Sequence, residues 1–309
     1  MRSIFNDAAL QAEFDQNGYV IVPFLDNAEV EYLKKAYFDT LPQRGGIAKG
    51  EGSGINISTP ITYDFTFIDR SSAYKSLVFD LITKCFAPLA GKYLDKYSPI
   101  IANFIRKDHD GGEVPLHQNW AFVDEQKYTS VSIWCPLIDS NEANGTLQIV
   151  KQSHKRFGKI RGPMVPWELN NIKNDIINDF LTPMNVKAGQ AVILDDSIVH
   201  YSAINKTQDL RLAIQLILIP AETHSIHHHF NTSIPNNPTI DVLKVDKDFY
   251  MSFTPWKNPE NVPKIARIPF KPHLVGIDEF KTRLKGRRFD EEQTNNSLWQ
   301  KIWAIFSDK

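Results

Sequence analysis

The chain has 309 residues, enough for one large domain or two small ones with a substantial core. Its formal net charge of -1, from 35 basic and 36 acidic residues, excludes a general electrostatic attraction to nucleic acid or membranes. The sequence contains no apolar run near the roughly 20 residues that span a bilayer and no signal-peptide pattern. Its two cysteines, Cys85 and Cys135, are too few for a disulfide framework. These features predict a cytoplasmic globular protein without nucleic-acid or membrane partners.

The first 99 residues are predicted to be mostly helical. A short helix over 8–17 should end at Gly18, and the β-branched and aromatic residues 19–24 favour a strand. Asp26 or Asn27 can cap a second helix that continues to about Leu41, and residues 71–94 predict a third. The glycine-rich segment 45–58 lacks the Lys-Ser/Thr pair of a phosphate-binding loop, so we expect it to form a lid loop or a disordered connector.

Residues 100–220 change to short strands separated by turn residues. The better candidates are 100–105, 129–137, 146–150, 190–194 and 210–219. Asn144-Gly145 is a strong hairpin signal between two of them. The pattern predicts a mainly β fold with flanking helices, a barrel or jelly roll, instead of alternating βαβ units.

Residues 221–309 are expected to form a C-terminal extension that closes with an amphipathic helix from about Glu292. Between Pro255 and Arg288 there are nine Lys or Arg and three Asp or Glu, which indicates either a solvated basic face or a surface that attracts an anionic substrate. Three adjacent histidines, His227 to His229, leave open a second metal site, a loop that touches the substrate, or plain surface exposure.

The segment His117-Gln118-Asn119 is the strongest candidate for a functional site. Residues two apart on a strand share a face, so His117 and Asn119 can hold one ion together, with His200 brought close by the fold. Two imidazoles and one oxygen ligand leave coordination positions open, as in non-haem Fe(II) oxygenases. The alternative is a hydrogen-bonded strand histidine without a metal.

Arg211 lies on a strand whose other face consists of leucine and isoleucine, and an arginine there is costly to bury unless it is paired. Its planar fork suits a ligand carboxylate, to which Ser202 could add a hydroxyl donor, although Asp195 or Asp196 could pair with it instead. Trp134 shares a face with Ser130 and Ser132, and that face either lines a cavity or packs in the core.

These positions together resemble the phytanoyl-CoA dioxygenase family. The resemblance runs from Phe14 to Pro220 and includes the segments FDQNGYVIVPFLDNAEVEYLK, LHQNWAFVDE, NGTLQIVKQSHK and VKAGQAVILDDSIVHYSAINKTQDLRLA. It implies a double-stranded β-helix (a cupin-like jelly roll), a single oxygenase domain over 1–309, and the use of Fe(II), 2-oxoglutarate and dioxygen. It also implies hydroxylation of an unactivated C–H bond in a small-molecule substrate.

Carried over by position, the resemblance makes His117 and His200 the iron histidines and puts Asn119 where the family has an iron carboxylate. Arg211 and Ser202 match the clamp for the far carboxylate of 2-oxoglutarate, and Gln118 and Trp134 match positions near the cosubstrate. His154 matches a recurrent position that we interpret as a structural loop histidine.

The departure at Asn119 leaves three interpretations: an oxygenase with an amide ligand or with a carboxylate from elsewhere, an iron-dependent halogenase, or a non-catalytic binding protein. Asp124 is the nearest alternative carboxylate in the sequence, but it lies on the opposite strand phase. An Asn119→Asp substitution is expected to tighten Fe(II) binding, because it restores the missing charge.

Overall fold

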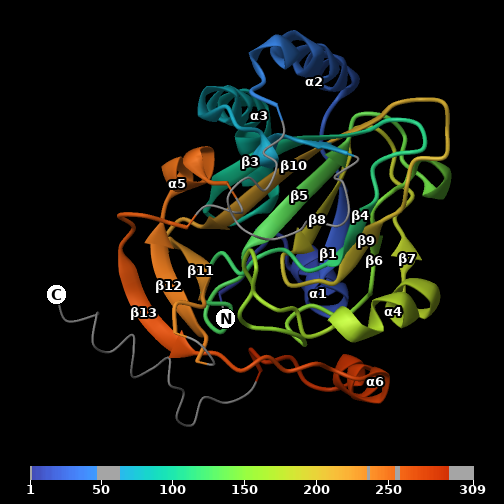
Figure 1. Cartoon of the computed structure of the whole chain (residues 1–309). Helices are drawn as coiled ribbons and strands as arrows, with labels where there is room; N and C mark the ends of the chain where they lie inside the picture. The colour runs from blue at the N-terminus through green and yellow to red at the C-terminus, as the bar shows by residue number, and fades with distance from the viewer. Residues whose placement is uncertain (1, 47–62, 235–236, 255–257, 292–309) are drawn as a thin grey trace.

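The computed structural model describes residues 2–46, 63–234, 237–254 and 258–291. These residues form three antiparallel sheets with helices on their outer faces, so the prediction of a mainly β fold with flanking helices is confirmed (Figure 1). The large sheet has the order β1-β8-β5-β10-β3-β2, and a smaller sheet has the order β4-β9-β6-β7. A third sheet, β11-β12-β13, follows in the C-terminal part of the chain.

The large sheet consists of β1 (Tyr19–Pro23), β2 (Asp64–Phe65), β3 (Tyr97–Lys107), β5 (Val131–Pro136), β8 (Gln190–Asp195) and β10 (Arg211–Pro220). The smaller sheet consists of β4 (Val114–His117), β6 (Gln148–Ile149), β7 (Thr182–Pro183) and β9 (His200–Ser202). The third contains β11 (Ser225–Asn231), β12 (Thr239–Val245) and β13 (Lys264–Pro269). The helices are α1 (Ala8–Asn17), α2 (Asn27–Thr40), α3 (Ser72–Tyr93), α4 (Lys173–Asp179), α5 (Lys247–Ser252) and α6 (Ile277–Lys285).

Local signals account for the N-terminal helices. Asp7 caps α1, and Gly18 ends it in the left-handed conformation with φ of 82°. Asp26 and Glu29 form a reciprocal capping box at the start of α2. The predicted lid over 45–58 and the predicted helix from Glu292 lie almost wholly outside the described residues.

The two faces of β10 and β5 separate two parts of the core. Leu212, Ile214 and Leu216 pack with residues of α2 and α3 on the outer face of the large sheet. Trp134 and Ala213 belong to a cluster on the inner face that includes residues of β6 and β8. The predicted strand phases are therefore confirmed, and the polar residues of β10 on the inner phase face the space between the two sheets.

The Asn144-Gly145 signal does not produce the predicted hairpin. A 3-10 turn over Glu142–Asn144 ends at Gly145, but the strands on its two sides belong to different sheets. β5 pairs with β8 and β10, whereas β6 pairs with β7 and β9. A Cβ on Gly145 would lie 2.2 Å from the Ala203 carbonyl oxygen, so the turn sits tightly against the segment after β9. The prediction of a turn at Asn144-Gly145 is confirmed, but the prediction that the two flanking strands pair with each other is wrong.

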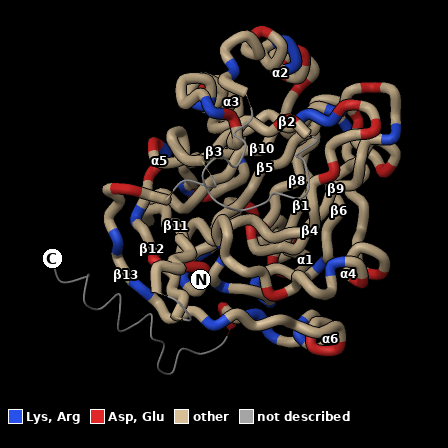
Figure 2. Tube along the Cα trace, viewed as in Figure 1, with Lys and Arg blue, Asp and Glu red and all other residues tan. Residues whose placement is uncertain are grey.

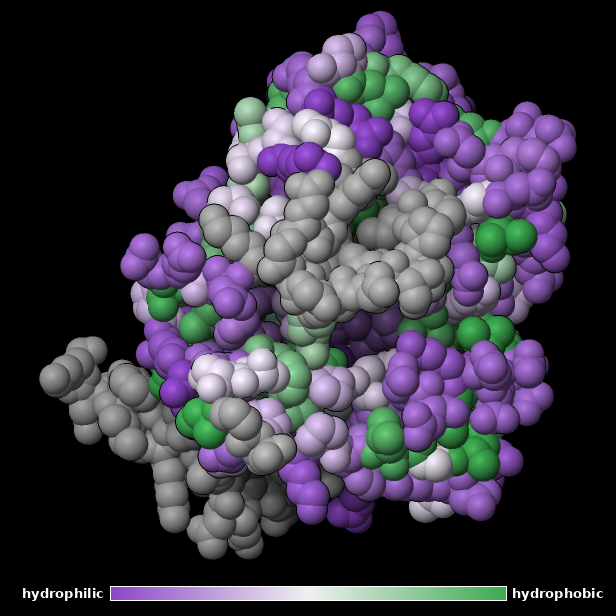
Figure 3. Space-filling model, viewed as in Figure 1, coloured by the Kyte–Doolittle hydropathy of each residue, from purple (hydrophilic) through white to green (hydrophobic). Residues whose placement is uncertain are grey.

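The chain beyond Pro220 is tied to the rest of the protein at several points. The Phe280 ring of α6 stacks on Phe157 with centroids 4.9 Å apart. Ile226 of β11 donates a backbone hydrogen bond to Phe122. Among the described residues every helix is too short or too polar to cross a bilayer. On the face seen in Figure 3, the apolar residues are scattered spots between polar ones outside the grey atoms.

Candidate metal centre

His117 and His200 are cross-strand partners on β4 and β9, at the inner face of the smaller sheet. Their ring centroids are 4.1 Å apart. Nδ1 of His117 bonds to the Pro115 carbonyl oxygen at 2.7 Å, and Nδ1 of His200 bonds to the Ile198 carbonyl oxygen at 2.9 Å. Each Nδ1 therefore donates to a backbone carbonyl, which orients the ring and leaves Nε2 as the nitrogen with a free lone pair.

Burial lowers the pKa of both imidazoles, and His117 lowers the pKa of His200 further. Both rings are therefore neutral at physiological pH. A neutral imidazole is the form that binds a metal, so the pair loses no affinity to protons at pH 7.

Asn119 follows β4 and faces the same cavity as both histidines. Its Nδ2 donates to Oδ1 of Asp196 at 2.8 Å and to Oγ of Ser132 at 3.1 Å. Nδ2 therefore faces Asp196 and Ser132, and Oδ1 lies on the opposite side of the amide, toward the cavity. The strand-phase prediction that His117 and Asn119 share a face agrees with this arrangement.

Within the described ranges, no three His, Cys, Asp or Glu side chains are arranged to hold a metal ion. Asp124, the alternative carboxylate, accepts from the Gln126 backbone at 3.2 Å and lies 3.7 Å from Nζ of Lys127, outside the cavity. Beside the two histidines, the residues that line the cavity therefore offer amide and hydroxyl oxygens, among them that of Asn119, and no carboxylate.

Arg211 lies on the inner face of β10, in the same cavity, and is 2% exposed. Its Nε and Nη1 have no hydrogen-bond partner among the described residues, and Nη2 is 3.5 Å from Oγ of Ser202. Asp195 bonds to Ser197, and Asp196 bonds to Asn119 and Ser132, so the alternative of an internal Arg–Asp pair is wrong. A bound carboxylate could accept hydrogen bonds from both unsatisfied nitrogen atoms of this buried guanidinium.

Lys107 is a second buried basic residue that the sequence analysis missed. It is 0% exposed and is the cross-strand partner of Arg211 on β3. Its Nζ donates to the carbonyl oxygens of Ser202 and Ala203 and to Oγ of Ser202, which are all neutral. Burial, and then the charge of Arg211, lower the pKa of Lys107 to about 6. Extending the predicted strand beyond Ile105 by two residues would have placed this lysine in phase with the cavity.

Ser202 contacts both buried basic side chains, Lys107 and Arg211. Its hydroxyl donates to the Gly145 carbonyl oxygen at 2.7 Å and accepts from Lys107. The single hydroxyl hydrogen of Ser202 is therefore donated to Gly145 and is not available to a ligand. In this geometry Ser202 holds the side chains of Lys107 and Arg211 in place.

The Gln118 amide is held by three partners away from this cavity. Nε2 donates to the carbonyl oxygens of Ser197 at 2.6 Å and Phe157 at 3.1 Å, and Oε1 accepts from the Trp167 indole at 3.0 Å. Gln118 therefore ties the segment between the two candidate ligands to the loops behind it. These hydrogen bonds favour a structural role for Gln118 over the expected contact with a cosubstrate.

The candidate site is a small cavity of about 100 Å³ between the two sheets. Trp134 forms one wall, with the Arg211 guanidinium 5.8 Å from its ring centroid. Its polar lining comprises His117, Asn119, His200, Ser202, Arg211 and Gln215. The sequence predictions for His117, Asn119, His200, Arg211, Ser202 and Trp134 thus concern residues that the fold brings into one cavity.

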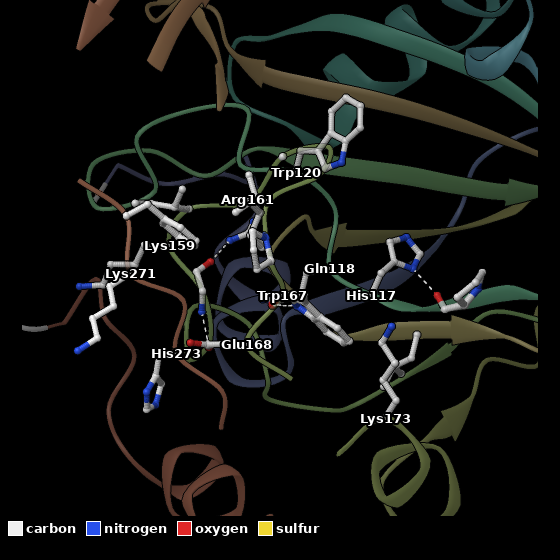
Figure 4. A pocket seen from close by; sticks show the side chains of 18 residues that line it. His117, Gln118, Trp120, Lys159, Arg161, Trp167, Glu168, Lys173, Lys271 and His273 are labelled. Atoms are coloured by element: carbon white, nitrogen blue, oxygen red, sulfur yellow. Dashed lines mark hydrogen bonds between the residues drawn. The ribbon is translucent and has the colours of Figure 1, made fainter. Parts of the chain in front are cut away.

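A wider groove of about 470 Å³ begins at His117 and runs away from the small cavity. Figure 4 shows Lys173 near His117 at one end, Lys159 and Lys271 at the other, and Trp167 between them. Nζ of Lys173 lies 5.5 Å from the Trp167 ring centroid. The groove therefore combines aromatic surface with positive charge next to the candidate ligands.

The basic segment after Pro255 contributes little to this groove. Lys and Arg recur along β12 and β13 (Figure 2), but Lys264 and Arg267 pair with Asp241. Arg283 pairs with Glu279 and with Glu168, an acidic residue that lines the groove. Lys271 is the basic residue of this segment that lines the groove among those described.

His227 and His228 are buried on β11, so the expectation of an exposed loop is wrong. His227 packs against Trp120 and Phe253, with centroids 5.6 Å and 5.1 Å away. Nδ1 of His228 bonds to the Arg161 carbonyl oxygen. His154 bonds to the Asp15 carbonyl oxygen near the end of α1, in agreement with a structural role.

Two facing antiparallel sheets with paired histidines between them define a double-stranded β-helix of the cupin-like class. The family model for phytanoyl-CoA dioxygenase (PhyH) matches residues 14–213. The chain belongs to this family.

Individual relatives agree. A Dictyostelium discoideum protein described as "Phytanoyl-CoA dioxygenase domain-containing protein 1 homolog" is 30% identical over 169 residues, which is 52% of this chain and 57% of that one. An Arabidopsis thaliana phytanoyl-CoA dioxygenase is 28% identical over 182 residues, 55% of this chain and 56% of that one. The chain thus spans about half the length of the curated relatives it matches.

Solved structures show the same fold at low identity. SnoK, a non-heme alpha-ketoglutarate-dependent carbocyclase from nogalamycin biosynthesis, superposes with a TM-score of 0.52 at 17% identity, covering 72% of this chain and 86% of SnoK. EctD from S. alaskensis with bound Fe gives a TM-score of 0.50 at 16% identity, covering 74% of this chain and 84% of EctD.

Proposed function

We propose that the protein is an Fe(II)- and 2-oxoglutarate-dependent oxygenase that hydroxylates an unactivated C–H bond of a small molecule. His117, His200 and the amide oxygen of Asn119 would hold the iron, and Arg211 would hold the far carboxylate of 2-oxoglutarate. The observation that carries the proposal is the buried Arg211 guanidinium, which lacks a carboxylate partner and lines the same cavity as the two histidines.

When bound, iron and 2-oxoglutarate supply the activation of dioxygen and the oxidising power of the reaction. The residues of the chain supply position and surroundings. The carbonyl oxygens of Pro115 and Ile198 fix the histidine rings, and Trp134 with the apolar inner face of the large sheet keeps water away from Arg211. The wider groove beside His117 would hold the substrate.

Anaerobic titration with Fe(II) and then 2-oxoglutarate tests the proposal. A weak visible metal-to-ligand band should appear when 2-oxoglutarate chelates the iron. A metabolite screen scored by 2-oxoglutarate-dependent succinate release then identifies the substrate, and the product mass distinguishes hydroxylation from chlorination. Absence of both the band and succinate would contradict the enzyme proposal.

A non-catalytic binding protein is the second candidate, because the described residues offer no carboxylate to the metal. In that case 2-oxoglutarate or another dicarboxylate should bind at Arg211, with no succinate formed in the presence of Fe(II) and air. Calorimetric binding without turnover in the same preparation would favour this candidate.

The positive charges of the groove predict a substrate with an anionic group and an apolar body. Changing Lys173 and Lys271 together to glutamine should raise KM for such a substrate by about three- to tenfold, because exposed charges contribute modestly. The kcat should stay nearly unchanged, since neither lysine lies among the candidate ligands. The measurement is steady-state kinetics on a substrate from the screen, at low and high salt.

The matched control is Lys35→Gln on α2, where the lysine pairs with Asp39 far from the groove. Its KM should equal that of the unmodified protein. An unchanged KM in the Lys173/Lys271 variant would remove the argument for an anionic substrate.

The binding of 2-oxoglutarate should weaken as pH rises from 6 to 9. Lys107, with its pKa near 6, is mostly neutral at pH 7.5 in the free protein, and a bound carboxylate would favour its charged form. Binding therefore takes up a proton above pH 6. The affinity is greatest below that pH and falls by at most about tenfold per pH unit, the limit for one linked proton.

Calorimetry of the metal-loaded protein in two buffers with different ionisation enthalpies measures the proton uptake. Lys107→Met should bind 2-oxoglutarate more weakly at pH 6 and lose most of the pH slope. A slope that persists in Lys107→Met would assign the linked proton to another group.

A further inference from the structure

We infer that Asp196 is a positioning residue for the metal ligand at position 119, and that Asn119 and Asp196 act as one pair in which the amide faces the metal and the carboxylate stands behind it. The inference rests on the proposed function, because it concerns the same metal site. It explains how the protein accommodates an asparagine where its family carries a carboxylate.

The contacts of Asp196 are confined to the back of the site. It follows β8 and is 0% exposed. Its Oδ1 accepts from Nδ2 of Asn119 at 2.8 Å and from Oγ of Ser132 at 2.6 Å. Its Oδ2 has no hydrogen bond within the part of the chain that the structure describes. The buried carboxyl group is thus held by Ser132 and by Asn119, the residue that faces the candidate metal.

This arrangement determines which end of the Asn119 amide points forward. Oγ of Ser132 donates to Oδ1 of Asp196 at 2.6 Å, so this oxygen is an acceptor that faces the NH₂ end of Asn119, and the reversed amide would bring two oxygens together at 2.8 Å. Ser132 accepts from the same Nδ2 at 3.1 Å. With Nδ2 facing these two acceptors, Oδ1 is directed to the side of His117 and His200. The orientation of the ligand is therefore present before any metal binds.

The same contact explains why a carboxylate at position 119 would be disfavoured. In Asn119→Asp an oxygen would replace Nδ2 at 2.8 Å from Oδ1 of Asp196, so the hydrogen bond that orients the side chain would become a contact between two acceptors. In this chain the carboxyl group of Asp196 contacts the amide from behind and does not line the cavity with the two histidines. The Asn119→Asp substitution alone is therefore expected to bind the metal less tightly than the sequence analysis predicted, because Asp196 remains opposite the new carboxyl group.

Four variants test the pair: Asn119→Asp, Asp196→Asn, the double swap Asn119→Asp with Asp196→Asn, and Asp196→Ala. The readout is the Kd for Co(II) by calorimetry on the full chain, together with the visible spectrum of bound Co(II). We expect the swap to bind Co(II) on the order of tenfold more tightly than Asn119→Asp alone, a coupling typical of residues in contact. Asp196→Ala should weaken binding by about 10- to 100-fold, as for other partners that orient a metal ligand.

Asp195→Asn is the matched control, because Asp195 is the adjacent buried carboxylate and bonds to Ser197 instead of Asn119. Its Co(II) affinity and spectrum should equal those of the unmodified protein. If circular dichroism shows that a variant does not fold, the inference is tested instead by hydrogen exchange of the Asn119 side-chain amide in the unmodified protein. The NH₂ protons of Asn119 should exchange slowly with solvent even without metal, and rapid exchange would overturn the inference.

Equal tightening by Asn119→Asp and by the double swap would also overturn the inference, since Asp196 would then have no effect on the ligand. That result would leave the metal site itself intact. If neither the unmodified protein nor the swap binds Co(II), the metal site of the proposed function fails, and the inference fails with it.

Discussion

Arg211→Met is expected to weaken 2-oxoglutarate binding by about 100-fold or more. The two unsatisfied donors, Nε and Nη1, can make charge-assisted hydrogen bonds to a carboxylate, each contributing about 1.5–3 kcal/mol. Losing both corresponds to at least two orders of magnitude in Kd. Calorimetric titration of the metal-loaded protein with 2-oxoglutarate measures the change.

The same substitution should stabilise the ligand-free protein. Arg211 is a buried cation without an ionic partner among the described residues, and an apolar side chain of similar size removes its desolvation cost. We expect the free energy of unfolding to rise by about 1–3 kcal/mol, as when buried charges are replaced by apolar residues. Denaturant unfolding without ligand measures it.

Arg106→Met is the matched control, because Arg106 is adjacent to Lys107 on β3 but pairs with Asp108 near the surface. It should change stability by no more than about 0.5 kcal/mol and leave 2-oxoglutarate binding intact. A loss of stability in Arg211→Met with unchanged 2-oxoglutarate binding would identify Arg211 as a structural residue.

His200→Ala is expected to weaken Co(II) or Fe(II) binding by at least about 100-fold. Changes to residues that merely orient a ligand cost about 10- to 100-fold in metal affinity, so removal of a ligand should reach at least the upper end of that range. His117 and Asn119 alone would hold the ion with two donors. Calorimetry with Co(II) under nitrogen, with thermal unfolding to verify the fold, gives the result.

His229→Gln controls for the loss of a histidine elsewhere, because His229 is half-buried on β11 and lies outside the cavity. It should bind Co(II) as the unmodified protein does. Retention of affinity in His200→Ala would mean that the paired histidines are a structural contact of the smaller sheet.

Local sequence signals predicted the elements whose causes are local. The capping box of Asp26 and Glu29 lies within one helical turn, and the alternation along β10 follows from the two-residue period of a strand. For the same reason the chain itself indicated that His117 and Asn119 share a face and that Arg211 lies opposite a leucine-rich face. His200 entered the same prediction as a histidine that the fold would have to bring close, and the family segments supported this placement.

Tertiary structure alone decided which faces meet. Lys107 lies opposite Arg211 because β3 pairs with β10 across about a hundred residues of chain, and periodicity carries no information about a strand's partner. The turn at Gly145 crosses between sheets for the same reason. Asp196 was considered as a partner for Arg211, yet it stands behind Asn119, 77 positions away. Sequence determined the residue types and their faces, while the packing of the two sheets determined that Asp196 contacts Asn119 and that Arg211 is left without a carboxylate partner among the described residues.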